Sequence, residues 1–319
     1  MSNDVSYTPE EVANILRISK FTVYELIKRG ELTAYHIGRK VRVEGTDIEN
    51  YKRKSKGLNP LEFPVASPLD SPISNDRSNH CFKSDESLVI CGQDIVLDIL
   101  TRYLEKQFPQ VHFLRRYIGS IDGLIALYRG MANVVTAHLW DSDTNEYNTP
   151  YVRRLLPGHP TCIINLVYRM EGFYVAKGNP QNITTWSDLT KPDVRFINRE
   201  RGSGARVLLD EKLRISGINH KDILGYGDEE MTHLAIASKV ARGEADVGLG
   251  IEKVVMQFIN LDFIPLHKER YDLVIRQEDL ERHHFQALMS ILQSPAFRNE
   301  VLGIGGYDIS QMGQIIAKM

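Results

Sequence analysis

The sequence predicts an α/β protein in which a small N-terminal domain precedes a larger, two-lobed domain with mixed sheets. Two observations carry this prediction. Strand and helix patterns alternate along residues 85–275, and a stretch rich in proline, serine and asparagine separates them from a short helical segment at the start of the chain. The length of 319 residues agrees, since domains usually hold about 100–200 residues.

Composition is that of an ordinary globular protein. Charged residues make up 25% and hydrophobic residues 42% of the sequence. The sequence contains no run of about 18 apolar residues, the length that a membrane-spanning helix needs. The first residues lack the basic and apolar regions of a secretory signal. The three cysteines lack CxxC spacing, which argues against a disulfide framework or a zinc site. We therefore expect a cytoplasmic protein with no membrane partner, metal or cofactor.

We place the domains at residues 1–56 and 85–319, joined by a linker at residues 57–84. The first segment has an excess of basic side chains and the remainder an acidic excess, so we expect only the first to meet a polyanion. The middle segment has a proline at every fourth position from Pro60 to Pro72 and few large apolar groups, which favours a linker. A surface loop within one domain is the alternative.

Two short helices are predicted near the N-terminus. Thr8 is followed by Pro9 and, three residues after the threonine, by Glu11, which is the pattern of a capping box at the start of a helix. Ser19 can cap a second helix that ends at Gly30. Two short helices joined by a tight turn are typical of a helix-turn-helix.

A hairpin with a basic tip is predicted next. The run LTAYHIGRKVRV has the strand character of a two-stranded wing, with residues 38–40 at its tip, and residues 47–56 predict a closing helix with a basic end. Such a wing is well placed to contact phosphates or a minor groove.

The segment TPEEVANILRISKFTVYELIKRGELTAYHIGRKVRV resembles the winged helix-turn-helix of the MerR and excisionase group. The resemblance implies that the second helix enters the major groove of double-stranded DNA and that the wing contacts phosphate. Any one of these side chains taken alone could equally be a solvated surface group. Since this segment has room for only a small core, we expect a homodimer. The residues expected to contact DNA are Ser19, Lys20, Thr22, Tyr24, Lys28, Arg39, Lys40 and Arg42.

Strands and helices alternate in the larger domain, and their βαβαβ order predicts a parallel sheet covered by helices. We expect strands at 87–92, 111–119, 133–141, 194–199 and 245–250, and long extended segments at 161–178 and 261–275. We expect helices at 94–108, 120–130, 204–217 and 233–243, and C-terminal helices that contain 283–293 and 310–319.

The run NRERGSGAR, between a predicted strand and a predicted helix, indicates an anion site. Gly202 and Gly204 permit a tight turn, and Ser203 supplies a hydroxyl beside the free N–H groups of the helix start. Arg201 and Arg206 add positive charge. The run is neither G-K-[ST] nor G-x-G-x-x-G, which excludes the common nucleotide loops. A plain strand-to-helix turn is the alternative.

Other strand ends fit the same site, because ligands of open α/β sheets bind outside the carboxyl ends of the strands. Gln93 follows the first strand, Gly119 and Ser120 follow the second, and His138 ends the third. A simple cap for Ser120 and a structural role for His138 are the alternatives, and Asp94 is expected to cap its helix. No nucleophile with an oriented base and no pair of catalytic carboxylates can be assembled, so we do not expect an enzyme.

The blocks NRERGSGAR, THLAIASKVARGEADVGLGI and ERYDLVI resemble the type II periplasmic-binding-protein-like domain of cytosolic regulators related to molybdate-binding proteins, over about residues 85–310. The resemblance implies two lobes joined by crossover strands, with an oxyanion in the cleft and with Tyr271 and His233 near it. Molybdate binders of this kind have a serine after the first strand, where Gly92, Gln93 and Asp94 stand here. The ligand therefore stays open between molybdate, tungstate, another oxyanion and a small organic anion.

The sequence thus predicts a transcription regulator that binds double-stranded DNA and a small anion, with molybdate or tungstate first. An anion-binding protein without a gene-regulatory role, either cytosolic or associated with transport, is the alternative. An enzyme acting on a phosphorylated substrate is opposed by the lack of an acid–base pair. The residues expected to bind the anion are Gln93, Gly119, Ser120, His138, Arg201, Gly202, Ser203, Gly204, Ala205, Arg206 and Tyr271.

Overall fold

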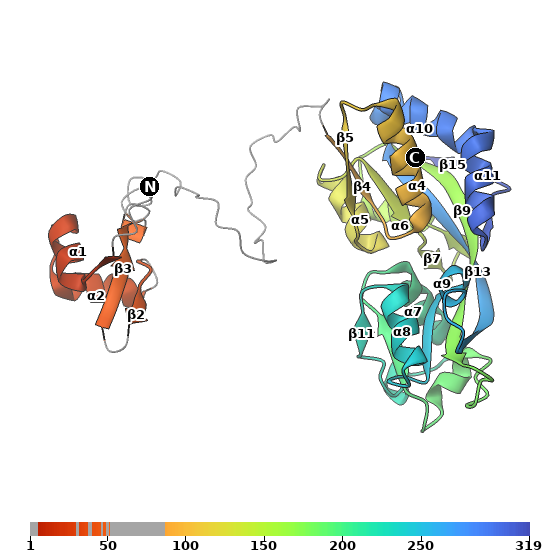
Figure 1. Ribbon diagram of the computed structural model, residues 1–319, viewed down its shortest axis with the longest axis horizontal. Coiled ribbons are helices and arrows are strands. Elements are labelled where there is room, and N and C mark those ends of the chain that lie inside the picture. The colour runs from red at the N-terminus through yellow and green to blue at the C-terminus, as the bar shows by residue number, and fades with distance from the viewer. Residues whose placement is uncertain (1–5, 30–31, 38–39, 46, 49–50, 52–86) are drawn as a thin grey trace. The chain divides into compact units, whose positions relative to one another are not determined.

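The structure is a computed structural model with two compact units, one within residues 1–77 and one within residues 78–319 (Figure 1). It describes residues 6–29, 32–37, 40–45, 47–48, 51 and 87–319. The predicted linker, Gly30, Arg39 and most of the helix predicted over 47–56 lie outside the described residues. Among the described residues, no helix has the length and apolar character needed to cross a membrane.

The N-terminal unit contains the helix-turn-helix and hairpin predicted from the sequence. Its elements are β1 (Ser6–Tyr7), α1 (Pro9–Leu16), α2 (Lys20–Lys28), β2 (Tyr35–Ile37) and β3 (Lys40–Glu44). Thr8 begins α1 through the predicted capping box with Glu11, and Ser19 begins α2 by accepting the backbone N–H of Thr22. β3 pairs antiparallel with β1 and β2, and Val12, Val23 and other aliphatic side chains fill a small core beneath them.

The first lobe of the larger unit has the predicted βαβαβ order. Its elements are β4 (Ser87–Cys91), α4 (Ile95–Gln107), β5 (His112–Arg116), α5 (Ser120–Tyr128) and β6 (Val134–Ala137). β4 lies between β5 and β6 and pairs parallel with both, so the carboxyl ends of the three strands meet at one edge. A small hairpin and a helix follow, namely β7 (Trp140–Asp141), β8 (Glu146–Tyr147) and α6 (Thr149–Leu155).

Two strands of 16 residues each, β9 (Thr161–Ala176) and β13 (Leu261–Arg276), run from one lobe into the other (Figure 1). They pair antiparallel along their whole length, with register shifts between Pro265 and His267 and between Tyr271 and Asp272. β6 pairs with the first-lobe half of β13, and β12 (Val247–Ile251) pairs with the second-lobe half of β9. One mixed sheet, in the order β11-β10-β12-β9-β13-β6-β4-β5, therefore extends through both lobes.

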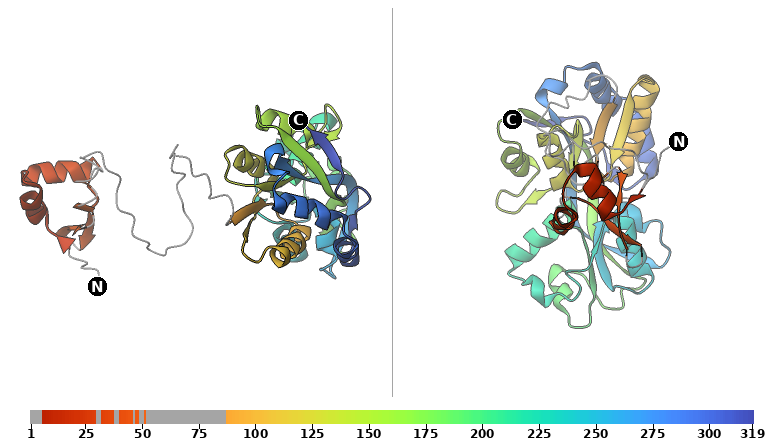
Figure 2. Two further views of the ribbon diagram at one scale, coloured as in Figure 1. Left: turned by 90° about the horizontal axis from the view of Figure 1, so that it is seen from above. Right: turned by 90° about the vertical axis from the view of Figure 1, so that its left-hand side faces the viewer.

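The second lobe, seen below the first in the right-hand view of Figure 2, repeats the arrangement of strands ending at helix starts. Its helices and strands are η1 (Trp186–Thr190), β10 (Phe196–Arg199), α7 (Gly204–Ser216), η2 (His220–Asp222), β11 (Glu229–Glu230), α8 (His233–Ala241), β12 and α9 (Glu252–Val255). β10 pairs parallel with β11 and β12. Each lobe has its own buried aliphatic core, so the fold is two-lobed and mixed as predicted.

The C-terminal prediction was partly wrong. The structure has η3 (Gln277–Asp279), α10 (His283–Gln293), α11 (Pro295–Ile304), β14 (Tyr307–Asp308) and β15 (Ile315–Lys318). The helix predicted over 310–319 is instead strand β15, which pairs with β9, and the sequence reading missed α11. The backbone of Gly313 has φ +79°, which interrupts any helix there, and pairing with β9 then outweighs the helical pattern of the last residues.

Candidate functional site

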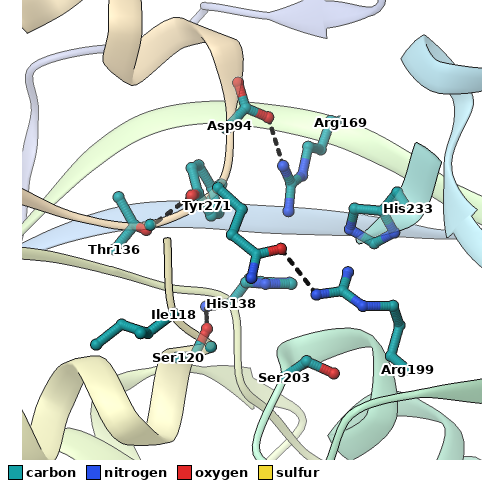
Figure 3. A pocket seen from close by; sticks show the side chains of 13 residues that line it. Asp94, Ile118, Ser120, Thr136, His138, Arg169, Arg199, Ser203, His233 and Tyr271 are labelled. Atoms are coloured by element: carbon teal, nitrogen blue, oxygen red, sulfur yellow. Dashed lines mark hydrogen bonds and ion pairs between the residues drawn. The ribbon is translucent and has the colours of Figure 1, made fainter. Parts of the chain in front are cut away.

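A pocket lies between the two lobes, at the carboxyl ends of β4, β5, β6 and β10 (Figure 3). The first lobe lines it with Gly92, Gln93, Asp94, Ile118, Gly119, Ser120, Thr136 and His138; the second lobe adds Arg199, Ser203 and His233; and the crossover strands add Arg169 and Tyr271. The structure thus brings together six of the residues predicted to bind the ligand. They are Gln93, Gly119, Ser120, His138, Ser203 and Tyr271.

Four helices begin at this pocket. Asp94 caps α4 as predicted, Gly119 precedes α5, Ser203 caps α7 and Thr232 caps α8. The first N–H groups of a helix have no partner within it, and the helix dipole adds positive potential at that end. Four such ends from two lobes make the pocket favourable for a small anion.

The two lobes touch beside the pocket at the predicted glycines. Gly202 has φ +88°, and its carbonyl oxygen accepts the N–H of Ile121 at 3.1 Å. A Cβ atom on Gly204 would lie 2.3 Å from Nδ1 of His138. Both glycines therefore permit the close approach of the lobes, although neither lines the pocket itself.

Besides these two glycines, three further predicted ligand residues do not reach the pocket. Arg201 is 86% exposed and lies near Glu229. Arg206 is buried, but its guanidinium pairs with Asp210 and Glu229 and stacks on the ring of Tyr226. The side chain of Ala205 packs into the core of the second lobe. Acidic and aromatic neighbours, which the local sequence pattern did not reveal, hold Arg206 away from the pocket, and Arg201 is directed to solvent.

Two other arginines supply positive charge at the pocket. Arg169 of β9 is 4% exposed; its Nε bonds Glu269, its Nη1 lies 2.5 Å from Asp94, and its guanidinium stacks 4.1 Å from the ring centre of Tyr271. Arg199 bonds Glu200 and, across the lobes, Oε1 of Gln93 at 2.9 Å. Figure 3 shows both guanidinium groups directed toward the pocket.

A group of buried titratable side chains lies behind the lining. Nδ1 of His138 is 2.7 Å from Oε2 of Glu269, and both carboxylate oxygens of Glu171 are buried without a hydrogen-bond partner in the described residues. Burial raises the pKa of Glu171 well above its ordinary value, and neighbouring Glu269 raises it further. Burial would also raise the pKa of Glu269, but Arg169 and His138 outweigh this and hold it well below its ordinary value.

Ligand atoms of His138, Glu171 and Glu269 lie within 4.8 Å of one another, a spacing that could hold a metal ion. One oxygen of Glu269 already bonds Nε of Arg169. A cation at this point would face that guanidinium at close range, so charge repulsion opposes a metal.

The remaining lining groups are neutral. Burial and the neighbouring arginines hold the pKa of His233 well below its ordinary value, so its imidazole is uncharged. Burial raises the pKa of Tyr271 to about 12, and its hydroxyl lies 2.7 Å from that of Thr136. The pocket therefore combines helix N-termini, hydroxyl groups and two buried arginines, which suits binding of a small anion.

Residues 101–293 match the family described as PBP superfamily domain, and residues 6–56 match the family described as helix-turn-helix domain. The first match covers more than half of the chain. This chain belongs to the PBP superfamily. We refer to residues 87–319 as the PBP domain and to the described residues before them as the helix-turn-helix domain. Both families are binding domains, and neither is catalytic.

Known proteins are similar to this chain over its whole length or over part of it. The uncharacterized protein YvgK of Bacillus subtilis is 42% identical over 317 residues, which are 99% of this chain and 99% of YvgK. The molybdate-binding protein ModA of Mycobacterium tuberculosis is 28% identical over 145 residues, or 44% of this chain and 50% of ModA. The crystal structure of the tungstate ABC transporter from Geobacter sulfurreducens aligns with TM-score 0.51 and 14% identity, covering 68% of this chain and 98% of that one, and supports the PBP fold.

Sequence reasoning missed Thr136 and both pocket arginines of the PBP domain. A signal for Arg169 was present, because the charged pair Arg169 and Glu171 interrupts an otherwise apolar strand. Such residues are rarely buried unless they are paired. The partners Asp94 and Glu269 lie 75 and 100 positions away in the chain, and only the fold brings them to Arg169.

In the helix-turn-helix domain, α2 presents several of the predicted DNA contacts to solvent. Thr22, Tyr24 and Lys28 are exposed, whereas Val23 and Leu26 face the core. Ser19 is exposed and caps α2, and Lys20 pairs with Glu10 of α1. In the wing, Lys40 is exposed and Arg42 is half-buried.

Proposed function

We propose that this protein is a one-component transcription regulator. Its helix-turn-helix domain, of the MerR and excisionase type, binds double-stranded DNA, and its PBP domain binds a small oxyanion that modulates DNA binding. Molybdate and tungstate are the first candidates for the anion. Since the target is DNA, we place the protein in the cytoplasm.

One observation carries the anion part of this proposal: four helix N-termini from two lobes meet at one buried pocket. Ser120 and Ser203, 3% and 1% exposed, add hydroxyl groups there, and Arg169 and Arg199 add charge. The similarity to ModA supports molybdate, and the fold shared with the tungstate transporter is compatible with either anion.

The DNA part rests on the match to the helix-turn-helix family and on the exposed polar face of α2. Thr22, Tyr24 and Lys28 would face base edges and phosphates in a major groove, and Lys40 of the wing would contact phosphate. We further propose a homodimer, because paired half-sites about 34 Å apart give such small domains sufficient affinity.

The test of the ligand is calorimetric titration of the full chain with molybdate, tungstate, sulfate and phosphate. We expect tight binding of one or two of these anions. Ser203→Ala should weaken that binding, because it removes a hydroxyl and the cap of a helix that faces the anion. Absence of binding for all four would contradict the oxyanion assignment and leave an organic anion.

The test of regulation is fluorescence anisotropy with a DNA duplex selected from a random-sequence library, measured with and without the bound anion. A ligand shifts DNA affinity only through its different affinity for the two protein states, and couplings of about 5- to 150-fold are typical. Equal affinity in both conditions would remove the regulatory role. Tight anion binding with no DNA binding would favour the alternative, an anion-binding protein without gene-regulatory function.

A further inference from the structure

The pocket and the layer behind it hold more acidic than basic side chains. Four buried or nearly buried carboxyl groups face two arginines, and each arginine already bonds carboxylates: Arg169 bonds Asp94 and Glu269, and Arg199 bonds Glu200. The titratable groups around His138 are Asp94 at the start of α4, Arg169 and Glu171 of β9, Arg199 of β10, Glu200 directly after β10, His233 of α8, His267, Glu269 and Tyr271 of β13, and Tyr147 of β8. An entering dianion therefore meets no surplus positive charge.

One of the four carboxyl groups carries a proton. Glu171 is 0% exposed, its two oxygens have no partner among the described residues, and an oxygen of Glu269 lies within 4.8 Å of it. Two buried carboxylates at this separation cannot both be ionised without a large cost. Since Glu269 is bonded to Arg169 and His138, the proton resides on Glu171.

The ionised Glu269 determines the tautomer of His138. Its Oε2 lies 2.7 Å from Nδ1, so Nδ1 carries the hydrogen and donates it to Glu269. When the ring is neutral, its Nε2 atom has no hydrogen and carries a lone pair, which repels an anion. A second proton on Nε2 would turn the ring into an imidazolium held between Glu269 and the pocket, where it can neutralise part of the charge of a dianion.

We propose that the PBP domain takes up its oxyanion together with one proton from solvent, and that His138, backed by Glu269 and Glu171, accepts this proton. The inference rests on the proposed oxyanion function. Only a proton moves: the imidazole gains it at Nε2, and the buffer supplies it. Binding is therefore weaker at higher pH, because the proton becomes scarcer.

The test is calorimetry of the full chain with molybdate and with tungstate at about pH 7.5, in Hepes and in Tris, whose ionisation enthalpies differ. Both anions are fully deprotonated there, so the buffer-dependent part of the heat counts protons taken up by the protein. We expect about one proton per anion. The association constant should fall about tenfold per pH unit over the range in which the proton is taken up.

Two histidine variants locate the proton. His138→Gln should reduce the proton count to near zero, whereas the control variant His267→Gln, outside the pocket lining and at an imidazole whose pKa burial lowers to about 4, should keep a count of about one. Thermal melting of each variant checks that it is folded.

The wild-type measurement decides the question even if a variant fails to fold. Tight binding with no proton uptake and no pH dependence would overturn the inference and leave the oxyanion function intact. Proton uptake that persists in folded His138→Gln would overturn the role of that residue. If neither anion gives any heat in either buffer, the proposed oxyanion function and this inference both fall.

Discussion

Arg169 lines the pocket and joins the elements around it. It is 4% exposed, lies at the middle of β9, and joins Asp94 at the start of α4 to Glu269 on β13. An arginine can satisfy several acceptors at fixed angles, which a lysine cannot. The side chain thus ties the first helix of the first lobe to both crossover strands while it lines the pocket.

Removing Arg169 should affect stability as well as anion binding. Arg169→Gln leaves Asp94 and Glu269 buried without their cation, which should cost about 3–5 kcal/mol of the free energy of unfolding. Loss of a charged donor at the pocket should weaken anion affinity about 10- to 100-fold. Urea unfolding and calorimetry measure the two effects. The exposed Arg201→Ala is the control, and an equal loss of affinity there would show that the pocket lies elsewhere.

Gly204 is a second residue whose substitution should have a clear effect, because a Cβ atom there would lie 2.3 Å from Nδ1 of His138. Gly204→Ala should push the imidazole away from Glu269 or hold the lobes apart, at a cost of about 1–3 kcal/mol of unfolding free energy and with weaker anion binding. Gly227→Ala is the control, since nothing lies within 4 Å of its Cβ position. Wild-type affinity in Gly204→Ala would mean that contact between His138 and the second lobe is dispensable.

At the scale of elements, helix starts decide where the pocket lies. α4 and α5 belong to the first lobe and α7 and α8 to the second, and the first N–H groups of all four helices converge on the pocket between the lobes. The crossover strands β9 and β13 hold the two lobes in register along their full length. The topology of the sheet therefore determines where the site lies, and the side chains add hydroxyl groups and charge to it.

Variants of two serine caps distinguish an effect on stability from an effect on anion binding. Ser203 caps α7 at the pocket, and Ser294 caps α11, which is outside the pocket lining. Either change to alanine should cost about 1 kcal/mol of unfolding free energy through the lost cap. Only Ser203→Ala should also weaken anion binding in calorimetry. A similar loss of affinity in both variants would mean that the effect is one of stability alone.

At the scale of the whole molecule, the lobes of the PBP domain are in contact both beside the hairpin of the first lobe and across the pocket. Arg214 of α7 bonds Asp143 at 2.7 Å, and Glu211 bonds Ser142, both beside the β7–β8 hairpin of the first lobe. Arg199 reaches Gln93 across the pocket. An anion that adds donors from both lobes would stabilise this arrangement, and that differential affinity is the energy available for regulation.

DNA binding by the whole chain should depend on salt through the wing. The double variant Arg39→Ala and Lys40→Ala should weaken binding to all sequences and reduce the slope of log K against log salt by roughly one to two, because fewer phosphate counterions are released. The matched pair Arg153→Ala and Arg154→Ala, exposed on α6 of the PBP domain, should leave the slope unchanged. An unchanged slope in the wing variant would mean that its tip does not contact phosphate.

The candidate site could be read from the sequence only in part. Gln93, Ser120, His138 and Ser203 follow strand ends, and the rule that ligands of open α/β sheets bind outside the carboxyl ends of the strands grouped them in advance. The same reasoning assigned Arg206 to the ligand, because nothing local reveals that Asp210 and Glu229 hold its guanidinium.

The sequence by itself determined the elements whose stability is local. Thr8 and Ser19 cap their helices through bonds that reach only three residues along the chain, so the pattern is sufficient. The tertiary structure decided what depends on distant partners. Pairing with β9 makes a strand of residues 315–318, and the fold places Glu269 against Arg169 across 100 positions. A buried charge is stable only where its partner is held, and the complete sheet supplies that position.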